Sequence, residues 1–177
     1  MRILEWLAPA VPAEAVDWDA VYREEMPRVF NYFRYRGFDR ETAEDLTSAT
    51  FEKAWRARDR YRRARAAVPT WLLAIARNAA IDHLRRSRLA VPLAECSLRD
   101  EETPETQALR EAQSHRLRTL LAALPERERE LLALKYGAEA TNRAIATITG
   151  LGESNVGTIL HRTIGMLRDR WDEGGAQ

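Results

Sequence analysis

The residues WLLAIARNAAIDHLRR (71–86) give a strong helical signal near the middle of this 177-residue chain. Their apolar side chains recur every three or four residues, which places them on one face of an α-helix. The run ends in Arg85 and Arg86, whose charges complement the negative end of a helix dipole. No stretch alternates apolar and polar residues over six positions with β-branched enrichment, as a strand would. The sequence therefore predicts an all-α protein.

Two more helices are expected before this run. Asp17 is placed to cap the first, and Pro27 leaves the C-terminal limit of that helix open. A glycine-containing turn follows, after which Asp39 is placed to cap a second helix. Residues 56–68 have few apolar side chains, so we expect them to form a basic connection to the helix at 71–86.

The chain changes character after residue 90. Residues 91–112 are acidic and contain prolines, which predicts a flexible linker, with helicity resuming near Glu105. Pro125 is expected in the first turn of a further helix, which Gly137 closes. The apolar face predicted for that helix consists of Leu131, Leu132, Leu134 and Tyr136.

The last part of the chain has the pattern of a helix-turn-helix. A helix over residues 142–149, a turn at Gly150-Leu151-Gly152 and a long helix from Glu153 to about Arg170 are expected. Many helical hairpins share this pattern, so on its own it leaves DNA binding open.

The charge is concentrated in one segment. The net charge of the chain is +1, yet residues 56–88 hold ten arginines against Asp59 and Asp82. Of the 28 basic residues, 26 are arginine, which suits recognition of planar oxyanions but also arises from a GC-rich genome. Because aromatic residues interleave with these arginines, the segment is a candidate polyanion site; a solvated helix face is the alternative.

Other function classes find little support in the composition. Cys96 is the single cysteine, and the three histidines, His83, His115 and His161, fall in different predicted elements. There is no phosphate-binding glycine loop and no metal-ligand spacing, so we expect no catalysis, metal or cofactor. No apolar run of about 18 residues exists, and Glu5 and Pro9 interrupt the start of the chain, so we expect a cytoplasmic protein without a membrane insertion.

Two pairs of motifs carry a family resemblance. AEDLTSATFEKAW (43–55) precedes the run at 71–86, and LPEREREL (124–131) precedes NVGTILHR (155–162). Together they resemble the extracytoplasmic-function (ECF) sigma factors of bacterial RNA polymerase. The resemblance implies two small helical domains joined by a flexible acidic linker, the second a helix-turn-helix. The implied boundaries are an N-terminal extension (1–16), the sigma second domain (17–90), a linker (91–112) and the sigma fourth domain (113–173).

The resemblance also implies a function: a non-catalytic subunit that binds core RNA polymerase, recognises the −10 and −35 promoter elements and melts the −10 region. Its implied partners are the β′ clamp helices and β flap of the polymerase, promoter DNA as duplex and as non-template single strand, and an anti-sigma factor. The residues implied for polymerase binding share one predicted helix and are Glu44, Asp45, Ser48 and Phe51. Ser48 stands where the family commonly has Gln. Trp55 on this helix is expected in the core.

Two further sets of residues are implied for DNA. The −10 set supplies positive charge for phosphates, aromatic surfaces on which bases stack, and one amide that reads a base edge. Trp71 suits the core equally well. The set consists of Arg60, Tyr61, Arg62, Arg63, Arg65, Trp71, Arg77, Asn78, Arg85 and Arg86. The −35 set lies mainly at the start of the last helix: Lys135, Arg143, Ser154, Asn155, Thr158, His161 and Arg162. Gly157 and Ile159 replace basic residues common there, and Ala144 replaces a usual Glu, so we hypothesise weak or altered −35 reading.

Several alternatives stay open from the sequence. A sigma-like mimic that binds an anti-sigma factor without promoter recognition would explain the altered last helix, but it would not need the arginine-rich segment. A helix-turn-helix repressor would leave the first domain unexplained. The acidic linker suits a stand-in for RNA phosphate as well as a plain tether. Residues 1–16 match nothing in the family pattern.

Overall fold

The computed structural model describes residues 16–87, 116–117 and 119–173. The described residues contain helices and no strand, which confirms the all-α prediction. Residues 1–15 and the predicted linker 91–112 lie outside them. Besides short helical stretches at 116–117 and 119–122, the elements in chain order are α1 (Trp18–Tyr35), α2 (Arg40–Ala57), η3 (Arg58–Arg60), α3 (Val68–Ser87), α5 (Glu126–Leu132), η4 (Ala133–Gly137), α6 (Asn142–Thr149) and α7 (Glu153–Glu173).

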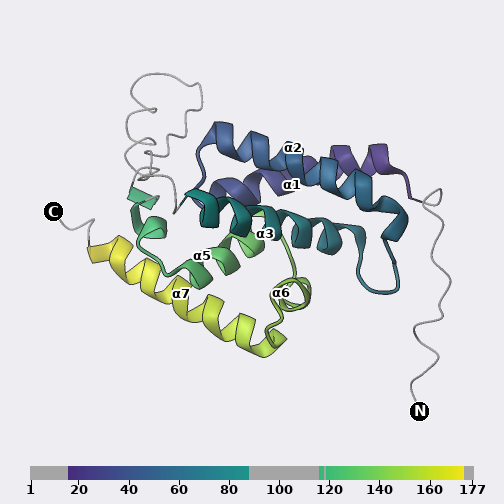
Figure 1. The fold of residues 1–177 in the computed structure, drawn as a ribbon. Coiled ribbons are helices and arrows are strands. Elements are labelled where there is room, and N and C mark those ends of the chain that lie inside the picture. The colour runs from purple at the N-terminus through teal and green to yellow at the C-terminus, as the bar shows by residue number, and fades with distance from the viewer. Residues whose placement is uncertain (1–15, 88–115, 118, 174–177) are drawn as a thin grey trace, which may run out of the picture.

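Helices α1, α2 and α3 form the first group (Figure 1). The side chain of Asp17 accepts hydrogen bonds from the backbone N–H groups of Asp19 and Ala20, and Asp39 accepts one from that of Thr42, so both predicted caps are confirmed. Pro27 lies inside α1 and does not end it.

The basic connection between α2 and α3 is shorter than the sequence suggested. α2 continues to Ala57 and a single 3₁₀ turn follows it, while α3 already begins at Val68. Pro69 therefore lies in the first turn of α3, where its missing N–H has no helical partner to lose.

Helices α5, α6 and α7, with η4, form the second group (Figure 1). Pro125 stands at the N-cap position of α5, one residue earlier than predicted, and the helix passes into a π-helical turn, η4. Tyr136 on this turn is half-exposed, so its predicted place on the apolar face is wrong. α6 and α7 form the expected helix-turn-helix, and α6 ends at Gly150, whose φ of +76° is the left-handed conformation that favours glycine.

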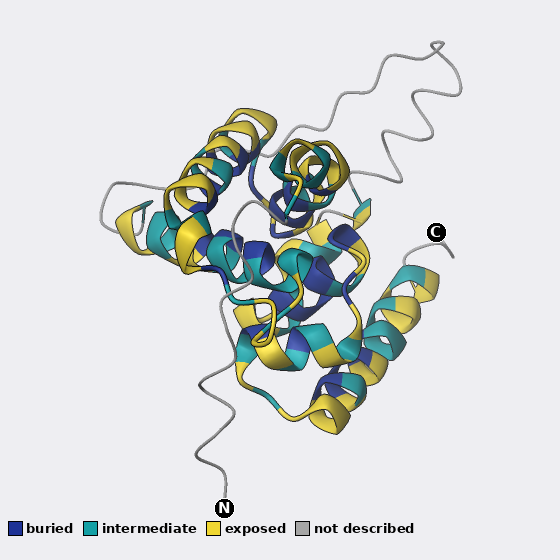
Figure 2. Ribbon diagram, turned by 90° about the vertical axis from the view of Figure 1, so that its right-hand side faces the viewer, coloured by how far each residue is buried: buried dark blue, intermediate teal, exposed yellow. Residues whose placement is uncertain are grey.

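The two groups pack against each other instead of standing apart. η4 lies against α1, and α6 lies against α3, so one apolar cluster runs through both groups. Buried residues gather in the middle of the molecule and exposed residues lie on its outer faces (Figure 2). No described helix is both long and apolar enough to cross a bilayer.

Candidate nucleic-acid interface

An aromatic cluster fixes the arginine-rich segment to the first group of helices. The ring of Tyr61 lies 5.2 Å from that of Trp71 and 6.2 Å from that of Trp18, between centroids. Tyr61 is only 3% exposed; its hydroxyl donates to the Ala66 carbonyl at 3.0 Å, and burial raises the pKa of its phenol. In this arrangement Tyr61 anchors the segment and presents no face on which a base could stack.

The arginines around this anchor face solvent. Arg60, Arg63 and Arg65 are exposed. Arg62 is half-buried, and its Nη1 donates to the carbonyls of Asp59 and Tyr61, each at 3.1 Å. The segment therefore presents several guanidinium groups from a loop held at its base.

The C-terminal half of α3 carries further exposed polar side chains. Asn78, Arg85 and Arg86 are exposed on it. Asp82 lies 3.8 Å from a guanidinium nitrogen of Arg85, and its carbonyl accepts a hydrogen bond from Nε of Arg86 at 3.2 Å. Asp82 thus contacts both arginine neighbours, one through its carboxylate and one through its backbone carbonyl.

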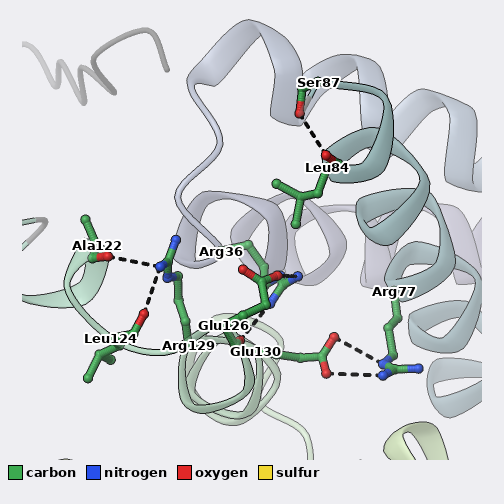
Figure 3. Close-up of polar contacts among 9 residues, drawn as sticks. All are labelled: Arg36, Arg77, Leu84, Ser87, Ala122, Leu124, Glu126, Arg129 and Glu130. Atoms are coloured by element: carbon green, nitrogen blue, oxygen red, sulfur yellow. Dashed lines mark hydrogen bonds and ion pairs between the residues drawn. The ribbon is translucent and has the colours of Figure 1, made fainter. Parts of the chain in front are cut away.

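Arg77 differs from the other residues of the predicted −10 set, because a carboxylate of the other group of helices holds it. Its Nε and Nη2 donate to the two carboxylate oxygens of Glu130 on α5, at 3.1 and 3.3 Å (Figure 3). The side chain of Glu130 is 10% exposed and that of Arg77 is 26% exposed. This fork joins the two groups of helices.

Sequence reasoning missed a second arginine of the same kind. Arg36 at the end of α1 has a side chain that is 1% exposed, and its Nη2 lies 2.5 Å from a carboxylate oxygen of Glu126 (Figure 3). Its Nη1 donates to the Glu126 carbonyl at 3.2 Å. An arginine in a last helical turn looks like a simple dipole partner, so nothing in the sequence marked Arg36 as a link between groups.

The predicted polymerase-binding residues lie on α2 as a polar strip beside an apolar groove. Glu44, Asp45 and Ser48 are exposed, with three- and four-residue spacings that place them on one side of the helix. Phe51 is half-buried, and its ring meets that of Tyr22 on α1 edge-to-face at 4.8 Å.

This groove between α1 and α2 has a volume of about 320 Å³. Tyr22, Phe51 and Trp55 contribute to its lining. Trp55 is 53% exposed and stacks under the guanidinium of Arg58 at 4.2 Å, so the expectation that Trp55 belongs to the core is wrong.

The start of α7 presents one exposed polar face, opposite the buried Val156 and Leu160. The side chain of Arg143 on α6 lies 3.5 Å from Glu153, and Lys135 is half-buried on η4. The exposed face of α7 consists of Ser154, Asn155, Thr158, His161 and Arg162.

The two positions of α7 that lack the basic residues common in the family, Gly157 and Ile159, differ in burial. Ile159 is 8% exposed and belongs to the core. Gly157 is half-buried, and a Cβ built there would lie 3.5 Å from the amide nitrogen of Asn142 on α6. Ile159 therefore turns inward, whereas Gly157 lies at the edge of the exposed face, so weak or altered −35 reading stays a prediction.

The described residues contain no group of three or more His, Cys, Asp or Glu side chains able to hold a metal ion. The first group offers guanidinium and amide donors, and the second offers a polar helix face of the width that enters a major groove.

Comparisons with known proteins agree with this architecture. The model of sigma-70 region 2 matches residues 21–89, and that of sigma-70 region 4 matches residues 114–167. The RNA polymerase sigma factor YlaC of Bacillus subtilis is 32% identical over 80% of this chain and 84% of its own. The ECF RNA polymerase sigma factor BldN of Streptomyces coelicolor is 27% identical over 94% of this chain, which spans 64% of BldN.

Two solved structures share the fold. CnrH in complex with the cytosolic domain of CnrY has a TM-score of 0.69 at 20% identity, covering 91% of this chain and 92% of the solved one. The sigma factor RpoE of Bartonella quintana, solved with the anti-sigma factor NepR, has a TM-score of 0.70 at 19% identity, covering 86% and 95%. With two family regions matched in order and a relative above 30% identity along most of its length, the chain belongs to the extracytoplasmic-function group of the sigma-70 family.

Proposed function

We propose that this chain is a promoter-specificity subunit of bacterial RNA polymerase, which recognises the −10 and −35 elements and melts the −10 region. The observation that carries the proposal is the set of exposed arginines between residues 60 and 65, held in place by the buried ring of Tyr61. Family membership supports the general assignment. The subunit itself performs no catalysis in this proposal, and its partners place it in the cytoplasm.

The −10 region would be held by several groups acting together. Opening a duplex costs roughly 1.4 kcal/mol of stacking per base-pair step, so no single contact suffices. The exposed arginines would bind phosphates of the separated strand, and Arg85 and Arg86 would extend that contact along α3. Asn78 would read a flipped base edge, because its amide both donates and accepts. Tyr61 and Trp71 would act as the support of this surface.

Core polymerase would bind the α2 strip and its groove. Protein–protein interfaces typically have aromatic side chains at their centre and polar side chains around the rim, and the groove and the α2 strip have this composition. We propose that Phe51 and Trp55 contact the β′ clamp helices while Asp45 contributes charge complementarity and steering. The second group of helices would contact the β flap and place the exposed face of α7 in the major groove of the −35 element.

Run-off transcription with core polymerase, on promoter fragments from the genome that encodes the chain, tests this proposal. The Arg62→Ala, Arg63→Ala, Arg85→Ala triple variant should lose specific starts and strand opening while still binding core polymerase. The Arg23→Ala, Arg127→Ala, Arg168→Ala triple variant removes the same charge from exposed positions elsewhere and should initiate normally. Normal initiation by the first variant would contradict the proposal.

An anti-sigma factor is a second partner that we propose. Two solved structures that share the fold are complexes, CnrH with the cytosolic domain of CnrY and RpoE with the anti-sigma factor NepR. If the wild-type chain bound core polymerase and an anti-sigma factor but gave no specific start, the sigma-like mimic would become the better assignment.

A further inference from the structure

The apolar groove between α1 and α2 has exposed aromatic side chains on both sides, and no other described element covers it. Tyr22 on α1 is 52% exposed and Trp55 on α2 is 53% exposed. The apolar surface of α1 continues past the groove, because Met26 stands one helical turn after Tyr22 and is 38% exposed. Single exposed apolar residues are ordinary, but a row of them along one groove marks a docking surface.

One apolar run of the sequence has no role so far; we call it the N-terminal run, and it lies outside the described residues. Its apolar side chains are separated by one, three and four positions, which is the pattern of one face of a short helix. On the same spacing Glu5 falls on the opposite side. The N-terminal run consists of Ile3, Leu4, Trp6 and Leu7.

The N-terminal run is joined to the helix that forms one wall of the groove. α1 begins at Trp18, which itself lines the groove, and residues 8–17 are the connector. A connector of this length spans up to about 35 Å when extended. Along α1 the distance from Trp18 to Met26 is only about 12 Å, at 1.5 Å per residue. Pro9 and Pro12 disfavour continuation of α1 through the connector, so the chain can turn back toward the groove.

Charge and tethering both favour this segment over a separate molecule. Asp19 and Glu52 are exposed at the groove, and Arg2 beside the N-terminal run supplies the opposite charge. A short connector holds the run near the groove at an effective concentration in the millimolar range. An intrinsic Kd about tenfold below that concentration is then enough to keep the groove occupied about nine-tenths of the time.

From these observations we propose that the N-terminal run of the same chain docks in the groove between α1 and α2. Its apolar side chains cover Tyr22 and Trp55, with Glu5 facing solvent. The proposal has a consequence that rests on the proposed function, because Phe51 and Trp55 are also the residues assigned there to core polymerase. The N-terminal run and the polymerase therefore compete for one surface, and core polymerase binds only chains whose groove is empty.

Occupation of the groove is measured on the free full-length chain, without polymerase. In a Cys96→Ser background, spin labels are placed at Glu5→Cys and at Lys53→Cys, an exposed position on α2. Pulsed electron–electron double resonance should give a short, narrow distance distribution. Replacing Leu4 and Trp6 together by serine should lengthen and broaden this distribution, and Val11→Ser, an apolar loss in the connector, should leave it unchanged.

A second pair of variants tests the groove from its own side. Tyr22→Ser should lengthen and broaden the distribution as the loss of Leu4 and Trp6 does. Tyr35→Ser removes another exposed tyrosine of α1, 41% exposed and outside the groove lining, and should not. Mixing the labelled chain with an excess of unlabelled chain should leave the short distance intact. Its loss on mixing would show that a second copy is the occupant and would overturn the proposal.

Competition is measured as the equilibrium affinity of the unlabelled chain for core polymerase. The apparent Kd equals the intrinsic Kd divided by the fraction of competent chains, so a groove occupied about nine-tenths of the time weakens binding about tenfold. The variant that lacks Leu4 and Trp6 should therefore bind core polymerase about tenfold more tightly than the wild type. Val11→Ser should bind like the wild type.

The outcomes distinguish this proposal from the proposed function. A broad distance distribution in the otherwise wild-type chain, or a short one that survives both Tyr22→Ser and the loss of Leu4 and Trp6, would overturn docking in the groove. If Tyr22→Ser does not fold, the double variant decides alone, since its changes lie outside the apolar core. Docking with unchanged core affinity would overturn the competition. Absence of specific starts by the wild type would refute the proposed function and leave the distance result standing.

Discussion

Asp39 caps the start of α2 with a carboxyl group that titrates. Its side chain accepts a 2.7 Å hydrogen bond from the Thr42 backbone N–H, and this bond is the main cause that lowers the pKa of the carboxyl. The ionised carboxylate of Asp39 therefore stabilises the folded state relative to the unfolded state. The stabilisation is present above the unfolded pKa of about 3.9 and is lost as the pH falls through the lower folded value.

Two substitutions separate the cap from its charge. Asp39→Ala should lower the free energy of unfolding by about 1 kcal/mol at neutral pH, because it leaves the first N–H groups of α2 without this acceptor. Asp39→Asn should keep most of that stability, since asparagine also caps, but should lose the acid-dependent part. Urea unfolding between about pH 7 and pH 3 measures both. Parallel loss of stability by the wild type and Asp39→Asn on acidification would contradict the assignment.

At the scale of elements, helix periodicity predicted well which side chains are exposed. It agrees with the exposed face of α7, because the 3.6-residue repeat fixes which residues share a side. The caps of α1 and α2 were predicted from aspartate, whose side chain accepts hydrogen bonds from the first N–H groups of a helix. Helix periodicity failed for Trp55 on the regular helix α2 and in irregular segments. Tyr61 follows a 3₁₀ turn and Tyr136 lies on a π-helical turn, where no simple repeat indicates whether a ring is buried.

The α7 face makes a prediction about sequence discrimination. In holoenzyme, Asn155→Ala with Arg162→Ala should lose about tenfold or more in affinity for a promoter, with most of the loss at the −35 element, because each base contact contributes roughly 1–3 kcal/mol. Electrophoretic titration against the promoter and a copy with a scrambled −35 element measures this. Arg168→Ala, exposed further along α7, removes one positive charge outside the face and should bind both duplexes nearly as the wild type does. Equal losses on both duplexes would show that the face binds phosphate without reading sequence.

At the scale of the whole molecule, the sequence predicted two helical groups but not their contact. The ion pairs Arg36–Glu126 and Arg77–Glu130 join residues 90 and 53 positions apart, and no local pattern connects such partners. Gly137 was interpreted as a helix end, although its significance is the close approach of η4 to α1. Only the folded chain brings these residues together, so the arrangement of the two groups depends on tertiary packing that the sequence does not display.

The shared apolar cluster predicts how the molecule unfolds. α5 and α6 are short helices, and a group of this size buries too little surface for high stability alone. Packing against α1 and α3 should therefore stabilise the second group and merge both into one cooperative calorimetric transition.

Gly137→Ala should split that transition in two, with the second group of helices melting at the lower temperature, because the added Cβ removes the contact that couples them. Gly165→Ala should keep a single transition, since its Cβ meets no atom within 4 Å. Two transitions in the wild type would mean that the groups fold independently.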